Sequence, residues 1–139
     1  MTPVFVDTSI WYAAADDGDA DCEVARSLLS EHGGALVTSD LVLAELWNLV
    51  NARIDHSAAN RTVAAITGGV ARVECATKAD LEAADAALAD FSDQAFSLTD
   101  RTSWALMERL AITDALALDA DFRVYRYGPQ RRRAFAVRP

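Results

Sequence analysis

Short apolar runs alternate along this chain with longer segments of helical periodicity, and this alternation restricts the possible folds more than any other feature. The expected strands are 4–7, 35–38, 71–75, 115–118 and a possible edge strand, 134–137. Strands that alternate with helices are typical of a parallel sheet covered by helices on both faces. The sequence therefore predicts an α/β fold with a central, mainly parallel sheet.

Capping residues and glycines mark the ends of the helical segments. Helices are expected from Asp19 or Asp21 to Glu31, from Ser39 to Arg53, from His56 to Thr67, from Thr77 onward and from Thr99 to Leu110. The helix after Ser39 is apolar almost all round, with Glu45 as an exception. Such a helix is expected to be buried, either in the core alone or with one side in a subunit interface.

Length and composition favour one compact domain over residues 1–139. The chain has 139 residues, of which 52% are hydrophobic and 24% charged, enough for a single packed core. No apolar run reaches the length of a membrane span, and the N-terminus lacks the pattern of a secretory signal, so we expect a cytoplasmic protein. Cys22 and Cys75 lack metal-ligand spacing and are expected to be free, buried thiols.

Four acidic residues occupy positions that converge in such a fold. Asp7 and Asp119 follow predicted strands, and ligands of parallel sheets bind beyond the carboxyl ends of the strands. Glu45 lies in the second turn of the helix that begins after Ser39, and Asp100 in the first turn of the helix before the 115–118 strand. The order of the elements therefore predicts that these four carboxylates share one pocket.

The electrostatic cost of such a pocket points to a cation. Two carboxylates about 5 Å apart repel by roughly 3 kcal/mol at an effective dielectric constant of 20. Either their pKa values rise or a divalent cation lies among them. Oxygen ligands without histidine or cysteine favour Mg²⁺ or Mn²⁺, which leaves coordination positions for substrate phosphate oxygens.

Each acid also has a structural role open to it. Asp7 and Asp100 suit helix N-termini, Glu45 can pair with an arginine, and Asp119 can form a turn with Asp121. The coincidence of all four favours a shared site.

Three sequence blocks, in order, resemble PIN-domain ribonucleases, most closely the VapC toxins of bacterial toxin-antitoxin pairs. They are "VFVDTSIW" with Asp7, "SDLVLAELWN" with Glu45, and "SLTDRTSWALMERLAITDALALDADF" with Asp100 and Asp119. The resemblance extends over nearly all of the chain. It implies a PIN-like α/β/α sandwich, one or two divalent metals held by the four acids, and endonucleolytic cleavage of RNA. It also implies a homodimer and a cognate VapB-type antitoxin whose C-terminal peptide occupies the site.

On this resemblance, a metal-activated water would hydrolyse the phosphodiester bond, with the four acids as metal ligands. Residues expected to position substrate or water are Thr8, Ser9, Asp121, Arg101, Arg123 and Arg126. The three arginines belong to an arginine-rich end, since residues 101–139 carry a net charge of +4 against −12 for residues 1–100. The last block differs from the family pattern, because Ala117 and Ala120 replace a threonine and a basic residue.

Other functions fit the sequence less well. Haloacid-dehalogenase phosphatases require a D-x-D-x-[TV] motif, and receiver domains require a lysine after their last strand; the chain has neither. His32 and His56 are remote from the acidic blocks, which argues against a metal-free, histidine-based ribonuclease. The remaining alternative is a non-catalytic module whose acidic pocket binds a basic partner peptide.

Overall fold

The computed structural model describes all residues 1–139 and contains a five-stranded sheet in which every neighbouring pair is parallel. The order across the sheet is β3-β2-β1-β4-β5. The strands are β1 (Val4–Val6), β2 (Leu36–Ser39), β3 (Arg72–Glu74), β4 (Asp114–Leu116) and β5 (Ala136–Arg138). The predicted α/β class and parallel sheet are confirmed, and each predicted strand overlaps an observed one.

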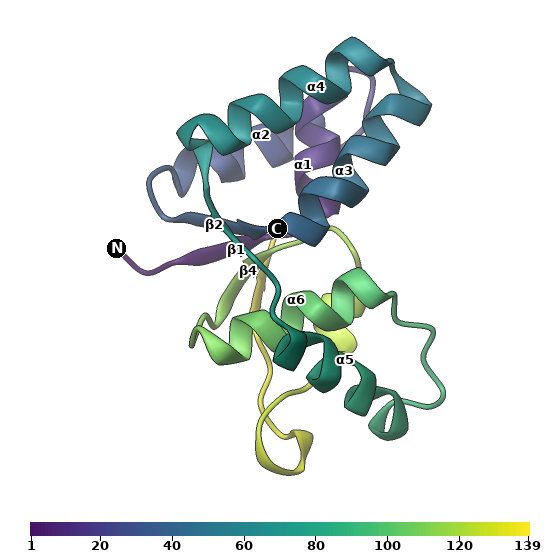
Figure 1. The fold of residues 1–139 in the computed structure, drawn as a ribbon. Coiled ribbons are helices and arrows are strands. Elements are labelled where there is room, and N and C mark those ends of the chain that lie inside the picture. The colour runs from purple at the N-terminus through teal and green to yellow at the C-terminus, as the bar shows by residue number, and fades with distance from the viewer.

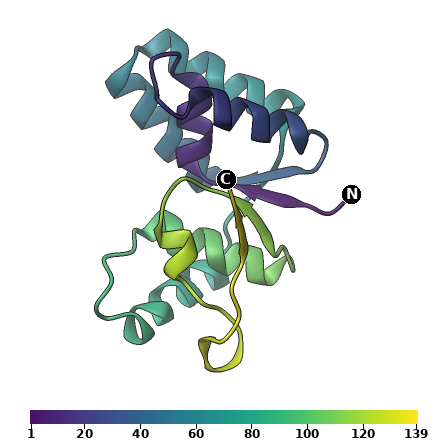
Figure 2. The same cartoon turned by 180° about the vertical axis from the view of Figure 1, so that it is seen from behind.

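Helices cover both faces of this sheet, so the molecule has three layers (Figures 1 and 2). One outer layer holds α1 (Thr8–Ala15), α2 (Cys22–Glu31), α3 (Asp40–Arg53) and α4 (His56–Ala65). The opposite layer holds α5 (Lys78–Asp90), α6 (Leu98–Arg109) and the single turn α7 (Asp121–Val124). The predicted helices match α2 to α6 to within a few residues. For α1 only the helix N-terminus considered for Asp7 was foreseen, and α7 was not predicted, because four residues are too few to show helical periodicity.

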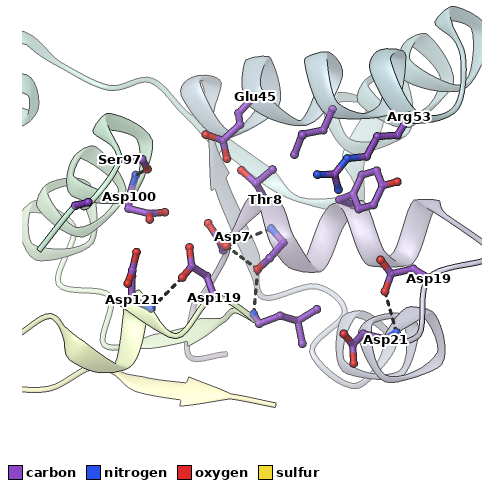
Figure 3. Close-up of a pocket in the computed structure, with 15 residues that line it drawn as sticks. Asp7, Thr8, Asp19, Asp21, Glu45, Arg53, Ser97, Asp100, Asp119 and Asp121 are labelled. Atoms are coloured by element: carbon purple, nitrogen blue, oxygen red, sulfur yellow. Dashed lines mark hydrogen bonds between the residues drawn. The ribbon is translucent and has the colours of Figure 1, made fainter.

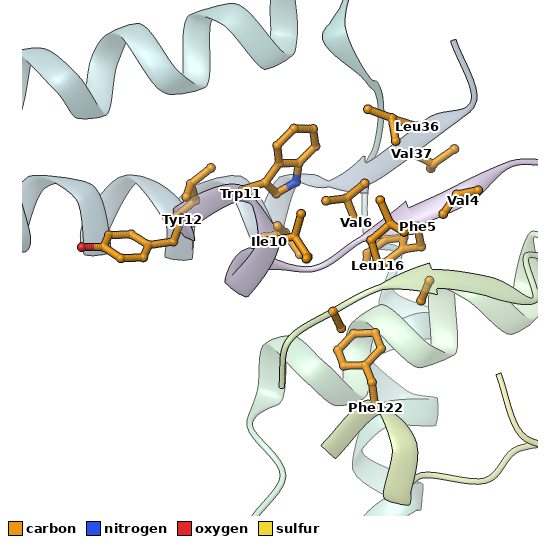
Figure 4. Packing of buried hydrophobic residues seen from close by; sticks show 14 of the residues in the cluster. Val4, Phe5, Val6, Ile10, Trp11, Tyr12, Leu36, Val37, Leu116 and Phe122 are labelled. Atoms are coloured by element: carbon orange, nitrogen blue, oxygen red, sulfur yellow. The ribbon is translucent and has the colours of Figure 1, made fainter. Parts of the chain in front are cut away.

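The core lies on both faces of the two central strands. All three residues of β1 are buried, and so are Ala115 and Leu116 of β4. Figure 4 shows apolar side chains packed above and below these strands. Because helices cover both faces, β1 is apolar throughout, and in β4 only the first residue, the half-buried Asp114, is polar. In the sequence, β1 is therefore one short apolar run, which is followed directly by Asp7.

The sequence also predicted that α3 is buried, and in the structure only one side of this helix is fully buried. Val42, Leu46 and Val50 are buried against the neighbouring helices α1 and α4. Leu41 and Leu49 are only partly covered. The helix therefore has one core face and one partly exposed apolar face.

The prediction of buried thiols holds for Cys22 and is wrong for Cys75. Both cysteines are free, but Cys75 is exposed, because it directly follows the edge strand β3. None of the helices has the length and apolar character needed to span a membrane.

Candidate metal centre

The fold brings together three of the four predicted acids at the carboxyl ends of its two central strands. β1 pairs with β2 on one side and β4 on the other, so the strand order reverses between β1 and β4. Parallel sheets bind ligands at this type of switch point. Carboxylate oxygens of Asp7, Asp100 and Asp119 lie within 4.8 Å of one another there (Figure 3).

Asp7 is held in place by the start of α1. It is the N-cap of this helix, and its Oδ2 accepts hydrogen bonds from the backbone N–H of Ser9 at 3.2 Å and from Ser9 Oγ at 2.6 Å. Ser9 Oγ in turn accepts a hydrogen bond from the backbone N–H of Leu118 at 2.9 Å. The structural role considered for Asp7 is therefore real, but it uses only one carboxylate oxygen. The other, Oδ1, is buried without a hydrogen-bond partner.

Asp100 enters the same space from α6. The N-cap of this helix is Ser97, whose Oγ accepts a hydrogen bond from the backbone N–H of Asp100 at 3.0 Å. Because Ser97 caps the helix, the Asp100 carboxylate is not used for capping and points toward Asp7 and Asp119 (Figure 3).

Asp119 combines a turn with a place in the cluster. Its Oδ1 accepts a hydrogen bond from the backbone N–H of Asp121 at 2.9 Å, at the start of α7. The turn considered for these two residues is therefore present, and Asp121 lines the same cavity. Burial, followed by repulsion from Asp119, raises the pKa of Asp121.

Glu45 lies on the opposite wall of the cavity, across from the three clustered carboxylates. It comes from α3 and its carboxylate faces the space above Asp7 (Figure 3). It forms no ion pair, so the arginine partner considered for it is absent. Thr8, from the first turn of α1, also lines the cavity, and its buried Oγ1 has no partner.

The cluster is electrostatically uncompensated. Burial raises the pKa of Asp7 to about 6. Burial, reinforced by repulsion from Asp7, Asp119 and Glu45, raises the pKa of Asp100 to about 8. A divalent cation would relieve this repulsion, and the free Oδ1 of Asp7 offers it a ligand. The residues therefore fit a site for a hard cation.

The surrounding cavity has a volume of about 470 Å³ and is strongly acidic. It is lined by seven carboxylate residues, namely Asp7, Asp19, Asp21, Glu45, Asp100, Asp119 and Asp121. Its single basic lining residue is Arg53, at the end of α3.

The three arginines predicted near the RNA do not line this cavity. Arg101 donates hydrogen bonds to the carbonyl oxygens of Phe96 and Ala84. Arg123 donates to the carbonyl oxygens of Val137 and Pro139 near the C-terminus. Arg126 donates to the carbonyl oxygens of the three residues that precede it. Their proposed contact with RNA stays a prediction.

Sequence reasoning missed Arg53, although a signal was available. Glu45, Leu49 and Arg53 follow each other at intervals of four residues, which places them on one side of a helix, and all three line the cavity.

Comparisons with known proteins agree with this geometry. The PIN domain family model matches residues 4–126. The 23S rRNA-specific endonuclease VapC20 of Mycobacterium tuberculosis is 40% identical over 120 residues, which cover 86% of this chain and 91% of the relative. Ribonuclease VapC26 of the same organism is 27% identical over 116 residues, which cover 84% of this chain and 86% of that relative.

A solved structure extends the similarity to three dimensions. The crystal structure of M. tuberculosis VapC20, described as a sarcin-ricin loop cleaving toxin, superposes with a TM-score of 0.82 at 36% sequence identity. The match covers 87% of this chain and 93% of the VapC20 chain. The matched family model, the similarity to VapC20 and the shared fold together show that this chain belongs to the PIN-domain family, among the VapC-type endoribonucleases.

Proposed function

We propose that this chain is a Mg²⁺- or Mn²⁺-dependent endoribonuclease toxin that uses the acidic cavity as its active site. The observation that carries the proposal is the meeting of Asp7, Asp100 and Asp119 within 4.8 Å, with one oxygen of Asp7 buried and unpartnered. Only oxygen ligands are present, which favours these ions over softer metals.

Each acid has a defined part in this proposal. Asp7, Asp100 and Asp119 hold the cation, and Glu45 acts from the opposite wall, directly or through water. When bound, the cation supplies a nucleophilic water and neutralises charge that develops on the phosphate. Ser9 fixes the orientation of Asp7 through its 2.6 Å hydrogen bond, so that the carboxylate is positioned before substrate arrives.

Thr8 and Asp121 complete the proposed site. The Thr8 hydroxyl is buried, lacks a partner and lies in the cavity wall, where it can hydrogen-bond a substrate oxygen or a water. Asp121, with its raised pKa, lies on the far side of Asp119 and can accept a proton from a positioned water.

We further propose ribosomal RNA as the substrate class. VapC20 is named as specific for 23S rRNA and as cleaving the sarcin-ricin loop. The match covers 91% of VapC20 in sequence and 93% of its chain in the solved structure, which supports a shared substrate class.

The biological setting follows from the family. We propose a cytoplasmic toxin formed by the whole chain as one domain, silenced by a VapB-type antitoxin. We also propose a homodimer, supported by the partly exposed apolar side of α3. Light scattering coupled to size-exclusion chromatography tests the dimer, and a monomer at micromolar concentration contradicts it.

An RNA cleavage assay tests the central proposal. Purified protein is incubated with a hairpin copy of the sarcin-ricin loop and with an unrelated hairpin of equal length, in Mg²⁺, in Mn²⁺ or in EDTA. We expect cleavage of the first hairpin only, and none in EDTA. We expect Asp7→Asn to reduce the rate by at least about 100-fold, since removing one charged ligand perturbs the whole site.

The matched control is Asp85→Asn, which makes the same chemical change at an exposed position on α5. This variant is expected to cut at the wild-type rate. Equal activity of wild type and Asp7→Asn, or undiminished cleavage in EDTA, contradicts the metal-dependent site. A protein that binds a basic peptide and cuts no RNA supports the non-catalytic alternative.

A further inference from the structure

Arg53 is the single basic side chain in a cavity that otherwise presents seven carboxylates. It is exposed, and it forms no ion pair, whereas the structure pairs Arg26, Arg72 and Arg109 with carboxylates. The pKa of nearby Asp16 is lowered by a hydrogen bond from Tyr12 and, to a smaller extent, by the charge of Arg53. No carboxylate forms an ion pair with Arg53, however, so its N–H groups can bind an anion from outside.

The position of Arg53 is fixed by an aromatic ring. Its guanidinium carbon lies 4.9 Å from the centroid of the Tyr12 ring. Tyr12 is itself buried, and its hydroxyl donates a hydrogen bond to Asp16 Oδ2 at 2.6 Å. Stacking on a ring orients a guanidinium while leaving its edge N–H groups available as donors. The pair therefore forms a preorganised cationic surface in the cavity wall.

The location of this pair matches the needs of an RNA substrate. Figure 3 shows Arg53 at the opposite end of the cavity from Asp100, with Asp7 and Thr8 between them. Glu45 and Leu49, one and two turns before Arg53 on α3, line the wall between these ends. A strand that places one phosphate at the three clustered acids and runs along this wall brings another phosphate to Arg53.

We propose that Arg53, held against Tyr12, binds a second backbone phosphate of the RNA, separate from the one that is cut, and so positions the strand in the cavity. The planar fork of donors on a guanidinium suits the two oxygens of a phosphate. Because the remaining wall is acidic, this contact also sets the path of the strand. The inference rests on the proposed ribonuclease function, and it names a positioning residue outside the cation-binding acids.

Binding measurements isolate this contact from catalysis. The binding of the hairpin that wild type cleaves is measured by fluorescence anisotropy over a range of salt concentrations, in an Asp7→Asn background that does not cut. We expect Arg53→Gln to weaken binding roughly tenfold. We expect the slope of log Kd against log salt concentration to fall by about 0.7 to 0.9, the value for one lost phosphate contact.

Three further variants separate this role from simpler ones. Arg53→Lys keeps the charge without the planar fork and is expected to retain the salt slope while binding less tightly than Arg53. Tyr12→Phe keeps the stacking ring and is expected to retain both affinity and slope. Arg61→Gln, a matched change on α4 at an exposed arginine that donates only to Ser57 Oγ, is expected to match the background protein.

Cleavage kinetics, measured with Asp7 intact, test the Arg53 contact independently of the binding assay. Arg53→Gln is expected to raise KM about tenfold and to change kcat less than threefold, because the contact is present in both the bound substrate and the transition state. Thermal unfolding tests whether the variant is folded. The slope of log Kd against log salt concentration is a second safeguard, because it does not depend on the fraction of protein that is active.

The outcomes distinguish this inference from the function on which it rests. If wild type cuts no RNA, both are overturned. If wild type cuts and Arg53→Gln binds with unchanged affinity and slope, the Arg53 inference alone is overturned. The same holds if Arg53→Gln changes only the affinity for Mn²⁺, because Arg53 then acts as a local counter-charge.

Discussion

Ser9 shows how much of the site depends on a single hydroxyl group. Its Oγ donates to Asp7 Oδ2 and accepts from the backbone N–H of Leu118, so it joins the end of β1 to the segment that follows β4. These two segments are more than 100 residues apart in the chain. This hydroxyl therefore orients a ligand, and it adds a side-chain link between two strand ends that the backbone bond from the Asp7 N–H to the Leu116 carbonyl oxygen, 3.0 Å long, already joins.

Replacement of Ser9 by alanine tests this double role. Ser9→Ala leaves the N–H of Leu118 without its partner, and we expect a loss of about 1–3 kcal/mol in the free energy of unfolding. We also expect weaker Mn²⁺ binding, measured by calorimetry, and slower cleavage. Ser9→Thr keeps the hydroxyl and is expected to recover most of the stability, the Mn²⁺ affinity and the cleavage rate. Mn²⁺ affinity in Ser9→Ala equal to that of wild type would contradict a positioning role.

The raised pKa values of Asp7 and Asp100 have a defined consequence for stability. In the absence of cation, the folded protein holds these protons more tightly than the unfolded chain, whose carboxyl groups have pKa values near 3.8. Stability therefore falls as pH rises above 3.8, and the fall continues until pH passes about 6 for Asp7 and about 8 for Asp100.

Removal of one titrating carboxyl group tests whether stability falls as pH rises. In EDTA, the Tm of wild type is expected to fall between pH 5 and pH 8, and that of Asp100→Asn to fall less. At pH 8, Asp100→Asn is expected to be more stable than wild type by at least about 1.4 kcal/mol, the equivalent of one pKa unit. Asp85→Asn serves as the control and should follow wild type. A Tm of wild type that rises over this range would contradict the assignment.

At the scale of elements, an ion pair between Asp80 and Arg109 connects α5 to α6 within one helical layer. Asp80 is buried and forms a capping box with Thr77. Both of its oxygens accept hydrogen bonds from Arg109, at 2.9 Å from Nε and 3.0 Å from Nη2. Burial acts to raise the pKa of Asp80, but hydrogen bonds from Arg109 and Thr77 outweigh it, and the net pKa is lowered. Arg109 is the last residue of α6, so this contact holds the end of the helix opposite to the turn that carries Asp100.

Loss of this pair is expected to cost far more than loss of a surface pair. Arg109→Met leaves the buried Asp80 carboxylate uncompensated, and we expect a loss of about 2–3 kcal/mol after allowance for the partial exposure of Arg109. Lys78→Met removes the exposed ion pair in which Lys78 Nζ lies 3.9 Å from Glu82 Oε1. We expect this change to lower the free energy of unfolding by less than about 0.5 kcal/mol. Chemical denaturation measures both. Equal losses in the two variants would contradict the structural role of the Asp80–Arg109 pair.

Element positions were largely predictable, because each strand and long helix has its own hydrophobic pattern and capping residue. The T-x-x-D motif at Thr77 forms the capping box that such a motif favours. The exposure of Leu81 and Leu88 on the same helix was not predictable, because helical spacing identifies a shared face but not which face meets the core. In α5 it is Ala84 and Ala87 that are buried.

At the scale of the whole molecule, the acidic cluster joins distant parts of the chain. Its members come from the end of β1, the first turn of α6 and the loop after β4. A cation bound by all three therefore links α6 to the ends of the two neighbouring strands β1 and β4, and through Asp7, the N-cap of α1, to the start of that helix. Binding to the folded state alone raises stability according to RT ln(1 + [L]/Kd).

Thermal unfolding with added cation tests this coupling. Mn²⁺ at 100 times its Kd is expected to stabilise wild type by about 2.7 kcal/mol, which appears as a higher Tm. At one fixed Mn²⁺ concentration, the shift should be larger at pH 8 than at pH 6, because protons compete for the carboxyl groups with raised pKa and so weaken Mn²⁺ binding at the lower pH. Asp119→Asn is expected to lose most of the shift, and Asp85→Asn to keep it. A shift of equal size in Asp119→Asn would contradict the site.

The sequence by itself determined the alternation of strands and helices, and with it the edge of the sheet at which Asp7 and Asp119 meet, because the carboxyl ends of parallel strands always lie together. Tertiary structure decided which other side chains share that edge. It placed Arg53 in the cavity, and it placed Arg101 against backbone carbonyls instead. Local patterns encode the direction of the chain, but the orientation of an exposed side chain depends on neighbours that only folding brings together.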